Sequence, residues 1–104
     1  MDQPAKFETM AASGVVSDRP SHLLGVILST DGASDPTVTV YDGTDDTGAE
    51  ALPATTFKAS DEGLNGVMFP FPVQCPAGIY LKIVGLGTQK VTVYYNRLLY
   101  KPGV

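Results

Sequence analysis

Residues 79–96 read Ile-Tyr-Leu-Lys-Ile-Val-Gly-Leu-Gly-Thr-Gln-Lys-Val-Thr-Val-Tyr-Tyr-Asn, and this stretch decides the fold class. Successive side chains of a β-strand point to opposite faces of a sheet, so an alternating apolar pattern marks a strand that buries one face. The pattern occurs twice here, and the inward-facing residues are expected to be Ile79, Leu81 and Ile83, then Val91, Val93 and Tyr95. Because a short glycine-rich linker joins the two segments, we predict that they form a β-hairpin.

Further candidate strands recur about every 8–12 residues toward the N-terminus, with clusters of Gly, Pro, Asp and Ser between them. They cover residues 14–17, 22–30, 37–41, 49–59 and 66–74. No window shows the 3.6-residue period and the caps of an ordinary helix. The sequence therefore predicts an all-β fold, a single antiparallel β-sandwich of about 7–8 strands spanning residues 14–104. Residues 1–13 lack periodicity and are expected to form a flexible N-terminal arm.

Two of these segments predict their own positions in the sandwich. In residues 22–30, Leu24, Val26 and Leu28 would share one face and Leu23 and Ile27 the other, which predicts a central strand covered on both faces. Residues 66–74 contain Pro70 and Pro72, and proline donates no ladder hydrogen bond, so this segment should be an edge strand. Its core-facing residues are expected to be Val67, Phe69, Phe71 and Val73.

Length and composition exclude several classes of protein. The 104 residues suit one domain, and only 17% of them are charged, which suggests that part of the surface is covered in the working state. The net charge is -4 and the seven basic residues are scattered, so no nucleic-acid surface is expected. No apolar run is long enough to span a bilayer and no signal peptide is visible, so we expect folding in the cytoplasm, away from membranes.

Cys75 is the only cysteine, which excludes an intramolecular disulfide and a cysteine-based zinc site. Its apolar surroundings predict a buried, inert thiol. His22 is the only histidine, and it opens a strand without a nucleophile motif beside it. A serine-histidine-aspartate relay would need this residue as its base, and a histidine-bound metal would need several such residues. We therefore expect no catalytic residue and no enzymatic activity.

Acidic and glycine-rich loops are the next candidates for a ligand site. Asp42, Asp45 and Asp46 lie in one loop and supply oxygens of the kind that Ca²⁺ takes, but their spacing is not that of an EF-hand. Residues 61–62, Asp-Glu, are interpreted as a solvated loop, and residues 85–87, Gly-Leu-Gly, as a turn without a dinucleotide motif. We expect no cofactor and no metal site.

Tyrosines are the remaining candidates for a binding surface. Alternation places Tyr41 and Tyr94 on outer faces and Tyr80 on the face opposite Ile79. Exposed tyrosines are favoured at protein interfaces and in sugar-binding sites, whereas tyrosines also cover sheet faces with no further role. Both interpretations stay open at this point.

Five short motifs follow one another over residues 14–96. They are Gly14-Val15-Val16, Leu24-Gly25-Val26, Val38-Thr39-Val40-Tyr41-Asp42-Gly43, Gly78-Ile79-Tyr80-Leu81 and Val91-Thr92-Val93-Tyr94-Tyr95. This order resembles that of small structural proteins of tailed bacteriophages. The resemblance implies a jelly-roll-like sandwich located in a virion and folded in the host cytoplasm before assembly. It implies a capsid decoration protein or a neck or tail component, without catalytic residues.

The partners that the resemblance implies are viral structural proteins, namely the major capsid protein or neck and tail subunits, together with other copies of the chain in a homo-oligomer. From their position in the chain, residues 1–13 and 97–104 are expected to carry the contacts, because an arm or tail can pair with a neighbour's sheet. A module that binds carbohydrate or a receptor is the alternative, and it would present several tyrosines around one concave patch.

Overall fold

The computed structural model describes residues 5–29, 35–58, 66–87 and 89–97, and these residues form eight strands. The strands are β1 (Lys6–Met10), β2 (Gly14–Ser17), β3 (Ser21–Ser29), β4 (Thr37–Asp42), β5 (Ala49–Thr56), β6 (Gly66–Cys75), β7 (Ile79–Val84) and β8 (Lys90–Arg97). They confirm the all-β prediction and its strand number. The described part of the chain holds no helix that is long and apolar enough to cross a membrane.

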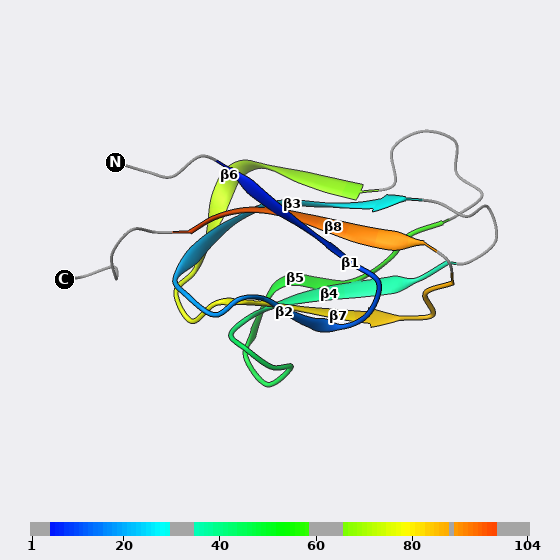
Figure 1. The fold of residues 1–104 in the computed structure, drawn as a ribbon, viewed down its shortest axis with the longest axis horizontal. Helices are drawn as coiled ribbons and strands as arrows, with labels where there is room; N and C mark the ends of the chain where they lie inside the picture. The colour runs from blue at the N-terminus through cyan, green and yellow to red at the C-terminus, as the bar shows by residue number, and fades with distance from the viewer. Residues whose placement is uncertain (1–4, 30–34, 59–65, 88, 98–104) are drawn as a thin grey trace.

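Two four-stranded antiparallel sheets lie face to face (Figure 1). One sheet has the order β1-β8-β3-β6 and the other the order β2-β7-β4-β5. The first strand pairs with the last, the second with the seventh, the third with the sixth and the fourth with the fifth. This is the pairing of a chain folded back on itself at its midpoint and wrapped into two sheets, which is the jelly-roll arrangement. The predicted antiparallel, jelly-roll-like sandwich is therefore confirmed.

The predicted hairpin of the last two strands is wrong. β7 belongs to the β2-β7-β4-β5 sheet and β8 to the β1-β8-β3-β6 sheet, so the chain changes sheets between Val84 and Lys90. Five residues reach up to about 17 Å, which spans the ~10 Å between packed sheets as easily as the ~4.8 Å between paired strands. Alternation identifies the face that each strand buries, and it carries no information about which strand lies beside it.

The predicted arm of residues 1–13 is also corrected, because Lys6–Met10 forms the edge strand β1. It pairs along its whole length with β8, from Lys6 opposite Tyr95 to Met10 opposite Val91. Four of its five residues are exposed, so the apolar alternation that signals a strand is missing from this segment. The ladder to β8 and the packing of Met10 against the core hold it in place.

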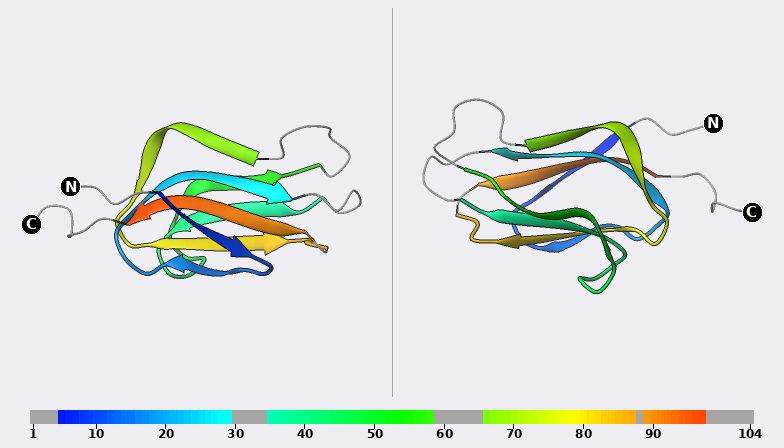
Figure 2. Two further views of the ribbon diagram at one scale, coloured as in Figure 1. Left: turned by 45° about the horizontal axis from the view of Figure 1, so that its top comes forward. Right: turned by 180° about the vertical axis from the view of Figure 1, so that it is seen from behind.

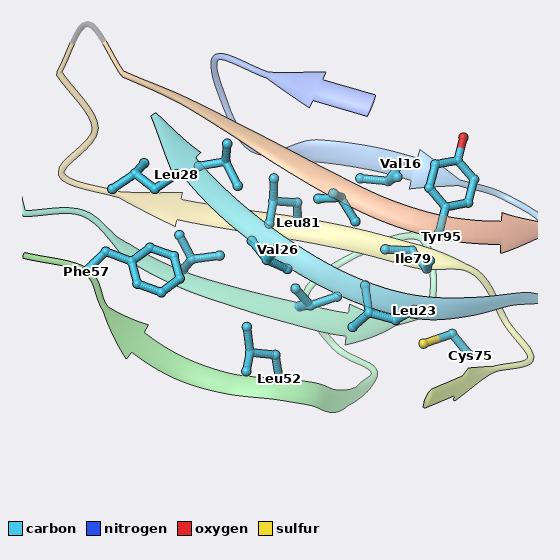
Figure 3. Packing of buried hydrophobic residues seen from close by; sticks show 14 residues of the cluster. Val16, Leu23, Val26, Leu28, Leu52, Phe57, Cys75, Ile79, Leu81 and Tyr95 are labelled. Carbon is cyan, nitrogen blue, oxygen red and sulfur yellow. The ribbon is translucent and has the colours of Figure 1, made fainter. Parts of the chain in front are cut away.

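Fourteen buried residues fill the space between the sheets (Figure 3). They include every inward residue predicted for β4, β8 and the first half of β7, while Ile83 is partly buried against the same cluster. Leu52 and Phe57, from β5 and the residue that follows it, close the side of the core away from β2. Cys75 is fully buried as predicted, and it lies beside Leu23 at the end of the core (Figure 3).

A β-bulge in β3 reverses part of the predicted pattern. Leu23 lies opposite Tyr95 of β8 and Gly25 lies opposite Tyr94, so Leu24 is an extra residue with no partner in that ladder. An extra residue shifts the alternation by one, which places Leu23 inward together with Val26 and leaves Leu24 half-buried. The strand is central, as predicted, but the bulge explains its two apolar faces. The described residues form no third layer over the outer face of this sheet, where Phe7 and Met68 are exposed.

β6 is an edge strand, as Pro70 and Pro72 predicted. Its pairing with β3 is interrupted at the residues that include these prolines. Met68 lies opposite Gly25 and Val73 opposite Leu23, so β6 advances five residues while β3 advances two. The three surplus residues let the strand bend away from β3 (Figure 2). Phe71 was expected to face the core, but at 78% exposure it points into solvent from this detached segment, which we call the β6 arch (residues 69–72).

Candidate binding face

One row of side chains crosses all four strands on the outer face of the β1-β8-β3-β6 sheet. Phe7 of β1 lies opposite Tyr94 of β8, Tyr94 lies opposite Gly25 of β3, and Gly25 lies opposite Met68 of β6. Val93 and Tyr95, on either side of Tyr94, are buried in the core, and Val67 and Phe69, on either side of Met68, pack against it, so the row itself faces outward. We call Phe7, Tyr94, Gly25 and Met68 the apolar row.

The apolar row is open to solvent at both of its ends. The Phe7 side chain is 67% exposed and that of Met68 is 51% exposed. The rings of Phe7 and Tyr94 pack at a tilt of 46° with centroids 6.3 Å apart, which is a favourable arrangement for an aromatic pair. A paired ring is held in position before any partner arrives, so less side-chain entropy is lost on binding.

Gly25 allows the row to be continuous. A Cβ atom at this position would meet the Met68 sulfur and would lie 2.8 Å from the carbonyl oxygen of Val67. The Met68 side chain therefore lies across the glycine, where any other residue would place its Cβ atom. Methionine is flexible and polarizable, and such side chains adapt to the shape of a partner surface.

Polar residues border part of the row on each side, and Ile27 of β3 lies opposite Thr92 on the same outer face. On one side, the hydroxyls of Thr9 and Thr92 are 3.1 Å apart and share a hydrogen bond. On the other side, His22 lies opposite Asn96 and Gln74. An apolar centre with a polar rim is the usual anatomy of a protein–protein interface. The β6 arch, which follows Met68 along the chain, carries the exposed ring of Phe71.

The outer face of the second sheet has a comparable row with more polar neighbours. It consists of Val15, Tyr80, Tyr41 and Glu50, one from each strand. The Tyr41 and Tyr80 rings are tilted by 52° with centroids 6.4 Å apart. The outward placements predicted for Tyr41, Tyr80 and Tyr94 are therefore correct. However, a carboxylate ends this row, and the Lys82–Asp46 ion pair at 3.7 Å lies on the same sheet.

The acidic loop of residues 42–48 uses its carboxylates in three different ways. Asp45 accepts hydrogen bonds from the hydroxyl and backbone N–H of Thr47, and these bonds lower the pKa of Asp45. Asp42 accepts a 2.9 Å bond from the backbone N–H of Ala77, and Asp46 pairs with Lys82. In the part of the chain that the structure describes, no three metal-ligating side chains are gathered. Asp61 and Glu62 lie outside the described residues.

One polar feature near the β2–β3 turn, a buried pair of serines, was not predicted. Ser17 and Ser21 are both 1% exposed, and their hydroxyl oxygens are 2.8 Å apart. Ser21 also donates to the carbonyl oxygen of Arg19, so the pair satisfies its own hydrogen bonds and closes the turn. The partly buried His22 follows, and the cross-strand neighbours Asn96 and Gln74 carry amides rather than a carboxylate or hydroxyl.

Burial, and then the negative charge of Asp42, raises the pKa of the Cys75 thiol to about 11. A thiol that keeps its proton at neutral pH is a poor nucleophile, which fits the predicted inert role.

The contact segments expected from the sequence, residues 1–13 and 97–104, stay predictions, and they share one described residue with the apolar row. Of the expected segment 1–13, Phe7 contributes to the apolar row. Of the expected segment 97–104, the structure describes Arg97 alone, and the rest lies outside the described residues. Sequence reasoning missed Met68 and Phe71, although the Phe-Pro-Phe-Pro motif at residues 69–72 carried a signal. Prolines on alternate positions exclude ladder pairing, so the phenylalanine between them cannot be held against the core by neighbouring strands.

Comparisons of the chain with protein-family models, with curated proteins and with solved structures found no match.

Proposed function

We propose that the chain is a non-enzymatic structural protein of a tailed-bacteriophage virion, and that it decorates the capsid by docking the apolar row onto shell subunits. The observation that carries the proposal is the row itself, Phe7–Tyr94–Gly25–Met68, which crosses four strands, is exposed at Phe7 and Met68 and is bordered in part by polar residues. Isolated exposed apolar residues need no explanation, but a contiguous patch with a polar rim marks an interaction site.

Three further observations support the proposal. The order of sequence motifs resembles that of phage structural proteins. The jelly-roll topology is shared by many viral shell proteins, which is an argument by analogy of fold alone. The low charged fraction of 17% suits a chain that is covered by neighbours in its working state. On a symmetric shell, many weak contacts of this kind add through multivalency.

The test is to purify particles of the phage that encodes the chain and to measure the chain in them by quantitative mass spectrometry. We expect copy numbers comparable with those of the shell subunit. A few copies per particle would instead support a neck or tail component. Absence of the chain from full particles would contradict a virion role, and glycan-array binding by the isolated chain would then support the carbohydrate-binding alternative.

A matched pair of variants tests the face. Particles made without the chain are mixed with purified wild-type protein, with Tyr94→Ser or with Tyr41→Ser. Both tyrosines belong to tilted aromatic pairs on outer faces, but on opposite sheets. Aromatic residues at the centre of an interface often contribute about 2 kcal/mol, so Tyr94→Ser should weaken binding at least about tenfold. Tyr41→Ser should bind as wild type, and equal losses in both variants would contradict the assignment of the face.

A further inference from the structure

The four edge strands of the sandwich differ in whether they can accept another strand. β6 carries Pro70 and Pro72 and leaves its ladder, and β5 carries Pro53. β2 has four residues and an irregular register. β1 is five residues long, contains no proline and pairs evenly with β8, so its other edge presents a regular row of backbone groups. Such an edge is a template for β-augmentation unless side chains prevent it.

The side chains of β1 are complementary to a second copy of the same strand. Lys6 and Glu8 lie on the inner face, opposite Tyr95 and Val93, and both are exposed. Neither forms an ion pair with any other described residue. Phe7 lies between them and points to the outer face. In an antiparallel pair centred on Phe7, each Lys6 lies opposite the partner's Glu8, and the two Phe7 rings are neighbours.

We propose that two copies of the chain pair through β1 in this antiparallel register and form one continuous eight-stranded sheet. A twofold axis passes beside Phe7, and the interface is isologous because the same residues contribute from both copies. Inward-facing charges usually protect a sheet edge. Here Lys6 and Glu8 carry opposite charges two residues apart, and they form two ion pairs with the second copy. The same charges therefore favour a second copy of this chain as the partner, in the register that pairs Lys6 with Glu8.

The pairing also joins the two apolar rows end to end. The combined row runs from Met68 through Tyr94 and Phe7 of one copy into Phe7 and Tyr94 of the other. The proposal goes beyond the proposed function, since it concerns self-association in solution and holds whether or not the chain belongs to a virion. Its test uses the purified chain alone, so its failure is distinguishable from a failure to bind particles.

Charge reversal is the first experiment, with molecular mass and dissociation constant measured by sedimentation equilibrium. Lys6→Glu and Glu8→Lys each place like charges opposite one another twice in the dimer. Both residues are exposed, so the fold should tolerate either change. Each single variant should dissociate at least about tenfold more readily than wild type. The double variant restores opposite charges and should dimerise as wild type.

Cysteine cross-linking is the second experiment and tests the register. Phe7→Cys places two thiols opposite each other, whereas Thr9→Cys on the same outer face places them about 14 Å apart, beyond the reach of a disulfide. Oxidation should yield a covalent dimer of Phe7→Cys and leave Thr9→Cys monomeric under denaturing electrophoresis. The native Cys75 is fully buried and does not compete.

Three results would overturn the proposal. They are a wild-type chain that stays monomeric at millimolar concentration, a dimer that neither single charge reversal weakens, and cross-linking that is as efficient through Thr9→Cys as through Phe7→Cys.

Discussion

Replacing two adjacent leucines of β3 by alanine tests the bulge on which the whole register of that strand depends. Leu23 is 0% exposed and lies between the two sheets, whereas Leu24 is the half-buried extra residue. Leu23→Ala removes three buried carbons, which at ~0.8 kcal/mol each lose about 2.4 kcal/mol of transfer free energy. The cavity left between close-packed sheets raises the expected loss of unfolding free energy to about 3–4 kcal/mol.

The matched variant Leu24→Ala should lower the free energy of unfolding by about 1 kcal/mol. The Leu24 side chain is partly in solvent, so its removal leaves no closed cavity. Urea denaturation followed by circular dichroism measures both free energies, with equal m-values as the check that unfolding remains two-state. Unbroken alternation along β3 would place Leu24 inward and Leu23 outward. A larger loss for Leu24→Ala than for Leu23→Ala would therefore refute the bulge.

Three further predictions concern single positions. Gly25→Ala should lower the free energy of unfolding by roughly 1–3 kcal/mol in the same assay, because the new Cβ meets the Val67 carbonyl oxygen. The control Gly14→Ala should lower it by less than about 0.5 kcal/mol, because its Cβ meets only the flexible end of the Met10 side chain. Phe71→Ser should change the free energy of unfolding by less than about 0.5 kcal/mol, since the Phe71 ring is in solvent. A larger loss would show that the ring packs in the core. Because the pKa of the Cys75 thiol is about 11 in the folded chain against 9.0 ordinarily, the free energy of unfolding should fall by about 2 kcal/mol as the pH rises from 9 to 11. The unfolded chain loses this proton first, so stability falls with pH, and Cys75→Ala should reduce the fall; an unchanged pH profile in that variant would contradict the raised pKa.

The fold class follows from local sequence because side-chain alternation reports burial directly. Val38 and Val40, or Val91 and Val93, bury one face wherever their strands lie in the sheets. The partners of those strands depend on contacts between distant residues, and residues 85–89 are long enough for either a hairpin or a crossover. β1 was missed for the same reason. The ladder to β8 holds this strand in place, and its exposed side chains carry no alternating pattern.

The candidate face was harder to predict than the core, because its residues come from four strands that the sequence separates. Phe7 and Tyr94 become neighbours only through the pairing of the first strand with the last. Met68 joins them only because the bulge at Leu24 brings Gly25, rather than a residue with a side chain, into the row. The exposure of Phe71 was within reach of sequence reasoning, because the prolines on either side of it cannot pair.

Cryo-electron microscopy of the intact particle tests the central claim most directly, by locating the chain and showing which of its faces is covered. The expected map has Phe7, Tyr94 and Met68 buried against a neighbouring subunit, with the Tyr41–Tyr80 face toward solvent. A map in which the apolar row faces solvent in every copy, while the opposite sheet contacts the shell, would contradict the account.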